Sequence, residues 1–222
     1  MARLPRLVLP GQAHVLIQRG LPGQPVFVDA DDRADFLRVL IEAAEVEQVG
    51  LHAFALLVSE VQLLATPVQA QGLARLVQAV GRRYVSAYNR RHRRAGTLWS
   101  GRFRCAVVEP GPFRLAALQW VDGAGGPGPS ALTSAPHRLG SAPHPGLVDP
   151  PEYWALGNTP FEREAVYRRL LDQGLSPSLS ASVRRAAMGG WALGSDGFVT
   201  QAGLTAQRPM RPRPRGRPRG RI

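Results

Sequence analysis

Lysine is absent from this chain of 222 residues, so its 28 basic residues are all arginine. Cysteine is nearly absent as well, and the single Cys105 excludes an intrachain disulfide and a zinc site built on cysteines. No apolar run approaches the length of a membrane-spanning helix, and the first residues do not read as a secretory signal. We therefore expect a cytoplasmic protein with no membrane partner, in a compartment where it meets nucleic acid.

Acidic residues are also scarce, at 16, and the net charge of +12 gives a pI of about 11.4. The positive charge is uneven: residues 81–104 hold eight arginines and no acid, and residues 208–221 hold seven more. Aromatic rings, Tyr84 and Trp99 among them, are interleaved with the first cluster. Guanidinium groups bind phosphates and flat rings stack on bases, so this pattern favours nucleic acid as a partner. A solvated basic helix face is the alternative.

The apolar patterns of residues 1–122 predict alternating strands and helices. We expect strands at residues 13–18, 51–57, 60–65 and 102–108, and helices between residues 29 and 50, between 73 and 96, and at 113–121. The order β-α-β-β-α-β is the split βαβ arrangement of the ferredoxin-like fold. The sequence thus predicts an α+β domain with an antiparallel sheet and two helices on one face.

Composition divides the remaining chain into three parts. Residues 123–150 are rich in Gly, Pro, Ser and Ala, which predicts a linker. Residues 151–200 contain the capping box TPFE and a second apolar pattern, which predict a small extension of two helices. Residues 201–222 hold too much Pro and Arg to pack, which predicts a disordered tail. Arg215 and Arg217 flank a glycine there, which matches the core of an AT-hook that binds a minor groove; a tail that binds polyanions without specificity is the alternative.

Four stretches resemble the REP-associated tyrosine transposases, relatives of the HUH single-strand transposases of bacterial insertion sequences. They are GQAHVLIQRGLPGQPVFVDADDRADFLRVL, LHAFALLVSEVQLLATP, GRRYVSAYNRRHRRAGTLWSGRFR and residues 159–198, which end in GGWALGSDGF. In that family two histidines, one residue apart on a strand, hold a divalent metal, and a tyrosine on a later helix forms a covalent link to DNA. The resemblance implies palindromic or hairpin DNA as the partner and a location at the bacterial nucleoid.

The residues that carry this chemistry are replaced here. The family's two histidine positions hold Glu60 and Gln62, and its tyrosine position holds Trp120, whose indole has no hydroxyl. Glu60 and Gln62 could offer oxygen ligands to Mg²⁺, or they could be solvated side chains on an open sheet face. Tyr84 and Tyr88 are substitute nucleophiles to consider, although packing or stacking suits their helical spacing better. We therefore expect no cofactor, with Mg²⁺ or Mn²⁺ needed only if cleavage is retained.

Three functions stay open at this point. The chain could bind single-stranded or hairpin DNA without cutting it, it could be an active transposase with altered metal ligands, or it could bind RNA on its sheet. The candidate DNA contacts are Arg82, Arg83, Tyr84, Asn89, Arg90, Arg91, Arg93, Arg94, Trp99, Arg102, Arg104, Arg215 and Arg217. If the first function holds, replacing the four arginines between residues 90 and 94 should weaken DNA binding. The sequence does not set the oligomeric state.

Overall fold

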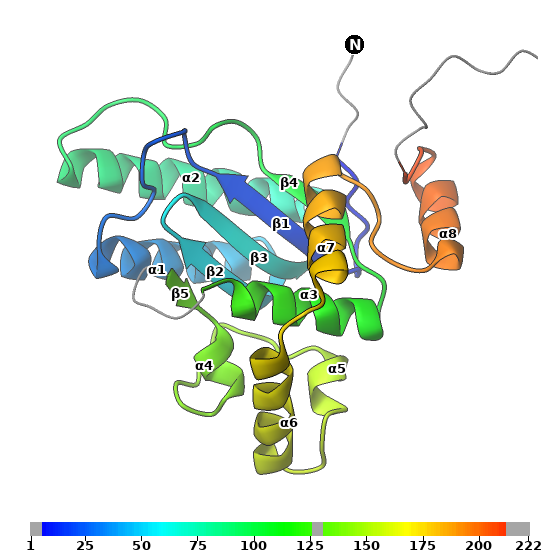
Figure 1. Ribbon diagram of the computed structural model, residues 1–222. Coiled ribbons are helices and arrows are strands. Elements are labelled where there is room, and N and C mark those ends of the chain that lie inside the picture. Colours follow the sequence, from blue (N-terminus) through cyan, green and yellow to red (C-terminus); the bar gives the residue numbers. More distant parts are fainter. Residues whose placement is uncertain (1–5, 126–130, 212–222) are drawn as a thin grey trace, which may run out of the picture.

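An antiparallel sheet of five strands lies at the centre of the protein (Figure 1). The structure is a computed structural model that describes residues 6–125 and 131–211. The strands are β1 (His14–Arg19), β2 (Val49–Leu57), β3 (Glu60–Pro67), β4 (Arg104–Val107) and β5 (Ala131–Thr133). Their order across the sheet is β4-β1-β3-β2-β5, so β1 and β3 are internal. The first four strands and their connecting helices confirm the predicted ferredoxin-like α+β fold.

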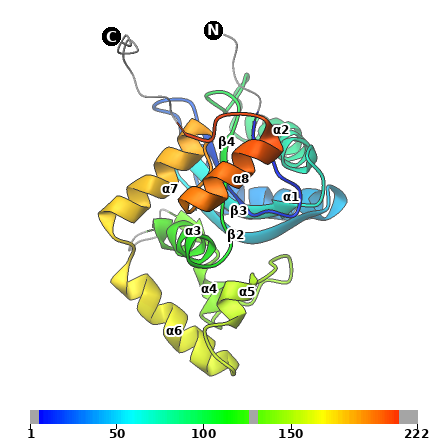
Figure 2. The same ribbon diagram turned by 90° about the vertical axis from the view of Figure 1, so that its right-hand side faces the viewer.

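Two long helices, α1 (Ala30–Val46) and α2 (Gly72–Arg91), cover one face of this sheet (Figure 2). As the sequence suggests, the Asp29 side chain caps α1 by accepting a hydrogen bond from the Asp32 backbone N–H at 3.0 Å. The core beneath the helices includes Val61 and Leu63 of β3. Because side chains alternate along a strand, Glu60 and Gln62 must point to the opposite face.

That opposite face is covered too. Helices α3 (Pro112–Asp122) and α7 (Pro177–Gly189) lie across it, packed over a second apolar cluster that contains the small side chains Ala53, Ala55 and Ala106 (Figure 2). Small residues let a helix approach the sheet closely. The expectation of an open sheet face around Glu60 and Gln62 is therefore wrong, since these residues are only 7% and 3% exposed.

Ordered structure fills much of the segment that composition marks as a linker. It contains η1 (Gly123–Gly125), strand β5 and helix α4 (Ala135–Arg138). The Arg138 guanidinium is fully buried and lies 2.9 Å from an Asp122 carboxylate oxygen and 3.1 Å from an Asp149 oxygen. The Tyr167 hydroxyl donates to the same Asp122 carboxylate at 2.6 Å. This buried ionic network ties the segment to the sheet.

The C-terminal extension consists of α5 (Pro151–Trp154), α6 (Pro160–Gln173), α7 and α8 (Asp196–Ala206). The predicted capping box is present, because Thr159 and Glu162 each bond the other's backbone N–H. Helix α8 is not expected from the sequence, and it takes up part of the stretch assigned to the disordered tail. Arg215 and Arg217 lie outside the described residues. None of the described helices is long and apolar enough to span a bilayer.

Candidate functional site

Glu60, which the resemblance assigns to a metal-ligand position, belongs to an ion pair in the structure. Glu60 and Gln62 lie side by side on β3, and the Gln62 amide donates to Glu60 Oε1 at 2.7 Å. Arg184 of α7 reaches the same carboxylate with both terminal nitrogens, at 2.8 Å to Oε1 and 3.0 Å to Oε2. Burial opposes ionisation of Glu60, but the bonds from Arg184 and Gln62 outweigh it and hold its pKa below the usual value. The Glu60 carboxylate is therefore charged and already paired.

These residues do not fit a divalent metal. Both carboxylate oxygens of Glu60 face the Arg184 guanidinium, which would repel a cation placed between them. The Gln62 amide turns its NH₂ group toward Glu60, so it does not offer its oxygen on that side. Within the described residues, no three His, Cys, Asp or Glu side chains gather into a metal-binding group. The oxygen-ligand arrangement that the sequence left open is thus not formed.

Trp120, which the resemblance assigns to the tyrosine position, lies close to this ion pair. It lies on α3 and lines a cavity of about 350 Å³ together with Gln62, Gln119 and Arg184. The Gln119 amide donates to the backbone carbonyl of Leu170. An indole carries one N–H donor and no ionisable oxygen, so Trp120 cannot form a phosphodiester link.

Tyr84 and Tyr88 cannot substitute for the missing nucleophile here. Both lie on α2, on the other side of the sheet from Glu60 and Gln62, and both are buried in the core under that helix. The Tyr84 hydroxyl donates to the Val26 carbonyl at 2.5 Å and the Tyr88 hydroxyl donates to the Pro25 carbonyl at 2.9 Å. Burial raises the pKa of both phenols, and the charge of Asp32 raises it further. Tyr84, predicted as a DNA contact, is instead a core residue that is 1% exposed.

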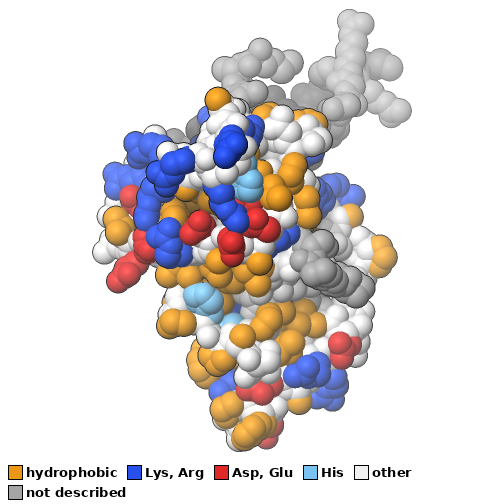
Figure 3. Space-filling view, turned by 90° about the vertical axis from the view of Figure 1, so that its left-hand side faces the viewer, with side chains coloured by type: hydrophobic (Ala, Val, Ile, Leu, Met, Phe, Trp, Pro, Cys, Tyr) orange, Lys and Arg blue, Asp and Glu red, His pale blue; other side chains and the backbone are white. Residues whose placement is uncertain are grey.

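The basic cluster at the end of α2 is partly neutralised by acids on α1. Arg91 lies 2.7 Å from Asp29, 3.0 Å from Asp31 and 2.6 Å from Asp32, and hydrogen bonds to Asp29 raise its pKa. Figure 3 shows arginine side chains gathered over this end of the molecule with acidic side chains directly among them. Arg91 therefore joins two helices, and its predicted role in DNA binding is not supported.

The other predicted contacts near α2 fall into two groups. Three arginines with exposed side chains have no hydrogen-bond or ion-pair partner within the described part of the chain, and these are Arg82, Arg90 and Arg93. The rest are held by the protein: Arg83 pairs with Glu42, Asn89 donates to the Gly96 carbonyl at 2.8 Å, and Arg94 donates to Gln24 at 2.9 Å. Trp99 is half-buried and lines a shallow hollow with Arg82 and Asn89.

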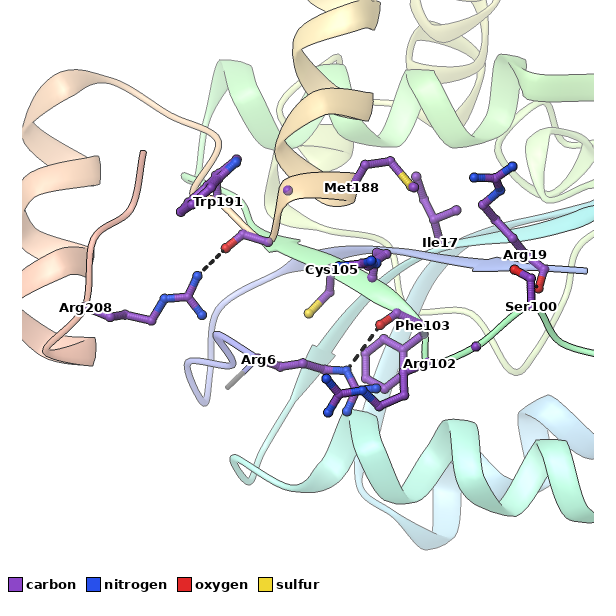
Figure 4. Close-up of a pocket in the computed structure, with 14 residues that line it drawn as sticks. Arg6, Ile17, Arg19, Ser100, Arg102, Phe103, Cys105, Met188, Trp191 and Arg208 are labelled. Atoms are coloured by element: carbon purple, nitrogen blue, oxygen red, sulfur yellow. Dashed lines mark hydrogen bonds between the residues drawn. The ribbon is translucent and has the colours of Figure 1, made fainter. Parts of the chain in front are cut away.

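An arginine-lined cleft of about 590 Å³ lies at the β4 edge of the sheet, and we call it the arginine cleft (Figure 4). It is lined by arginines from distant parts of the chain: Arg6, Arg19, Arg102, Arg104 and Arg208. Met188, Gly189, Gly190 and Trp191, at the end of α7, line it as well. No acidic residue is among the described residues that line it.

Two of these arginines are fixed by the protein. The Arg6 Nε donates to the Phe103 carbonyl at 3.2 Å, and its guanidinium stacks 4.0 Å from the centre of the Phe103 ring. Burial lowers the pKa of Arg6, and the neighbouring charge of Arg102 lowers it further. Arg208 donates to the Gly190 carbonyl at 2.7 Å and spans the gap between α8 and α7 (Figure 4).

Three further arginines of the cleft are exposed, namely Arg19, Arg102 and Arg104. In the described part of the structure their guanidinium groups form no hydrogen bond or ion pair. Arg19 has the Glu60 carboxylate as its cross-strand neighbour. Like charges that gather with few counter-charges create a positive potential, which attracts a polyanion. Of the cleft residues, Arg102 and Arg104 are predicted from the sequence as DNA contacts, and Arg208 begins the second basic cluster. Arg6, Arg19 and Trp191 are not among the contacts that the sequence predicts.

Comparison with solved structures gives two transposases of low similarity. One is the structure of a REP-associated tyrosine transposase bound to a REP hairpin, with 10% sequence identity and a TM-score of 0.47, covering 55% of this chain and 70% of that chain. The other is a candidate transposase from Deinococcus radiodurans R1, with 22% identity and a TM-score of 0.38, covering 49% of this chain and 88% of that one.

No family model matches the chain, and no curated protein matches it. Both neighbours are described as transposases, and one of them as REP-associated. At this identity, and with TM-scores below 0.5, neither neighbour decides what this chain does. A proposal for the function of this chain must therefore rest on the contacts of its own residues.

Proposed function

We propose that this protein binds single-stranded or hairpin DNA in the arginine cleft and does not cleave it. The observation that carries the proposal is the cleft itself, where exposed arginines meet at one sheet edge with no acidic residue among the described lining residues. Guanidinium groups bind phosphate oxygens through two parallel hydrogen bonds, which suits a nucleic-acid backbone. A protein of this kind would act at the bacterial nucleoid.

The loss of cleavage follows from two replacements. Strand transfer in the family that the sequence resembles needs a metal-bound phosphate and a hydroxyl nucleophile. Here the Arg184 guanidinium pairs with Glu60, and the nucleophile position holds Trp120. An active transposase with altered ligands would need a different nucleophile close to β3, and both candidate tyrosines of α2 lie across the sheet.

Single-stranded or hairpin DNA is favoured over a plain duplex by the shape of the site. The cleft combines cationic groups with the indole of Trp191, and an unpaired strand can present both its phosphates and its base faces to such a surface. The REP-associated neighbour is described as bound to a REP hairpin, which makes a hairpin with a single-stranded flank the natural probe. RNA remains the competing partner and is one arm of the test.

The test measures binding and cleavage with the same labelled hairpin. Fluorescence anisotropy with the full chain should give saturable binding that weakens as salt increases, because phosphate contacts release counterions. A matched RNA hairpin and a blunt duplex should bind more weakly. Incubation with Mg²⁺ or Mn²⁺ should yield no shortened strand and no covalent protein–DNA adduct on a denaturing gel. Covalent adducts would show that cleavage is retained. Tighter binding to the RNA hairpin than to the DNA hairpin would indicate that RNA is the partner.

A further inference from the structure

The ion pair between Glu60 and Arg184 joins residues 124 positions apart in the sequence. The Glu60 side chain is 10% exposed and the Arg184 side chain is 46% exposed, so the carboxylate lies inside the protein and the guanidinium reaches it from the rim. Their two contacts, at 2.8 and 3.0 Å, form a bidentate pair, and Gln62 adds a third bond to the same carboxylate. A carboxylate this buried needs a cation close by.

Arg184 supplies that cation from α7, and α7 leads directly into the arginine cleft. Met188 lies one helical turn after Arg184, on the same side of the helix, and it lines the cleft together with Gly189, Gly190 and Trp191. Gly190 ends the helix with φ of 69°, a left-handed conformation that suits glycine. The last turn of α7 is thus one wall of the cleft, and β4 with Arg104 is part of the other.

The wall carries specific contacts. The Gly190 carbonyl accepts the hydrogen bond from Arg208. Gly189 leaves room for the Trp191 ring, because a Cβ on Gly189 would come within 2.0 Å of the Trp191 indole nitrogen. Figure 4 shows Trp191 and Met188 across the cleft from Arg6 and Arg102. Because Arg208 bonds to Gly190 at the end of α7, a shift of α7 along the sheet would change the positions of Trp191 and Arg208 relative to Arg104 of β4.

We propose that the Glu60–Arg184 pair is a built-in replacement for a divalent cation, which fixes α7 on the sheet and so positions the Trp191 wall of the arginine cleft for DNA. This inference rests on the proposed function and assigns Arg184 as a positioning residue that does not touch DNA. The site that would hold a metal in the family that the sequence resembles thereby becomes the anchor of a binding surface.

Replacing Glu60 separates this proposal from its rival, in which Arg184 binds a phosphate directly. If Arg184 is an anchor, Glu60→Gln removes its partner, loosens α7 and weakens DNA binding. If Arg184 is a phosphate ligand held back by Glu60, the same change releases it and removes a nearby negative charge, so DNA binding becomes tighter. The two readings predict opposite signs for one substitution.

The experiment measures the dissociation constant of the full chain for a labelled hairpin with a single-stranded flank, at 0.1 M salt and 10 °C. Glu60→Gln and Arg184→Met should each weaken binding about tenfold, roughly the loss of one base stacked on Trp191. The double variant should be no weaker than either single one, because both remove the same anchor. Arg184→Lys, which keeps the charge, should restore part of the affinity. Arg185→Met is the matched control, since Arg185 is exposed and donates a hydrogen bond to Ser182 of its own helix. This substitution should change binding less than threefold.

Circular dichroism at 10 °C establishes that each variant is folded, and a loss of stability alone does not change the affinity of molecules that remain folded. Tighter binding by Glu60→Gln, or unchanged binding by Arg184→Met, would overturn the inference while leaving the proposed function in place. The proposed function itself fails if the unaltered protein does not bind the probe, or if removing Arg102 and Arg104 has no effect.

Discussion

Removing Arg102 and Arg104 together tests the arginine cleft most directly. Both guanidinium groups are exposed and have no partner within the described residues, so Ala substitutions remove charge without breaking an internal contact. Arg104 is the first residue of β4, and the paired backbone of that strand stays intact in the variant. We expect the fold to be unchanged and the affinity for single-stranded DNA to fall.

The size of the effect follows from counterion release. Each phosphate neutralised on a single strand contributes about 0.7 to the slope of log K against log salt, so the loss of two contacts lowers this slope by about 1.4. The same relation gives a loss of affinity of about 25-fold at 0.1 M salt and only about threefold at 0.5 M. A structural defect would instead weaken binding by a similar factor at both salt concentrations.

Anisotropy titrations of the unaltered chain and the variant, from 0.05 to about 0.5 M salt, measure both quantities. The matched control is Arg168→Ala with Arg169→Ala, which removes the same charge from exposed positions on α6, far from the cleft (Figure 1). This control should leave the slope within experimental error of the unaltered protein. If the two double variants behave alike, net charge alone attracts DNA and the cleft is not the binding site.

Three further predictions concern the folded state. Burial lowers the pKa of His14 from 6.5 to about 4, so the unfolded chain accepts a proton at a pH where the folded protein does not. The free energy of unfolding is therefore highest above pH 6.5 and decreases as the pH falls toward 4, by about 2 kcal/mol at pH 5. Urea denaturation at pH 7.5 and pH 5 should show this loss, and an equal loss in His14→Gln would contradict it. Arg138→Met should lower the free energy of unfolding by about 3–5 kcal/mol in urea denaturation, because it leaves the fully buried Asp122 carboxylate without its cation; a change below about 1 kcal/mol would refute this reading. Arg91→Ala should lower the melting temperature, because it breaks the contacts between α2 and Asp29, Asp31 and Asp32. The DNA affinity of this variant should stay within twofold of the unaltered protein. A loss of affinity as large as that of the cleft variant would show that Arg91 contacts DNA.

Local patterns predict the elements of the ferredoxin-like unit well because each depends on nearby residues. The Asp29 cap and the Thr159–Glu162 capping box are set by side chains three residues apart, and both form as expected. The apolar spacing of α2 also marks Tyr84 as part of its buried side, and that signal outweighs its place inside a basic cluster. Helix α8 is harder to foresee, since its sequence DGFVTQAGLTA has few strong helix formers and gains its packing from Leu7 and Val107.

The candidate site depends on long-range pairings that no local pattern encodes. Glu60 meets Arg184, and the arginine cleft unites Arg6 near the start of the chain with Arg208 near its end. The resemblance predicts that Glu60, Gln62 and Trp120 lie where the family has two histidines and a tyrosine, and this prediction depends on residue identity alone. What takes their place is visible only once α7 lies across the sheet.

Acidic residues are scarce in this protein, and their positions divide the arginines into two groups. Arginines next to a carboxylate stabilise the fold, and the others are available to bind a partner. Arg91, Arg114, Arg138 and Arg184 each meet a carboxylate on a different element, so each joins two parts of the structure. Arg19, Arg102 and Arg104 face a common cleft from which carboxylates are absent among the described lining residues. Arginine density along the sequence is highest at the end of α2, where Arg83 and Arg91 are paired with acidic residues, whereas Arg82, Arg90 and Arg93 have no partner within the described residues. The arginine cleft differs because its exposed arginines line one common hollow with no acidic residue among the described lining residues, and this arrangement is the reason we propose it as the surface for a polyanion.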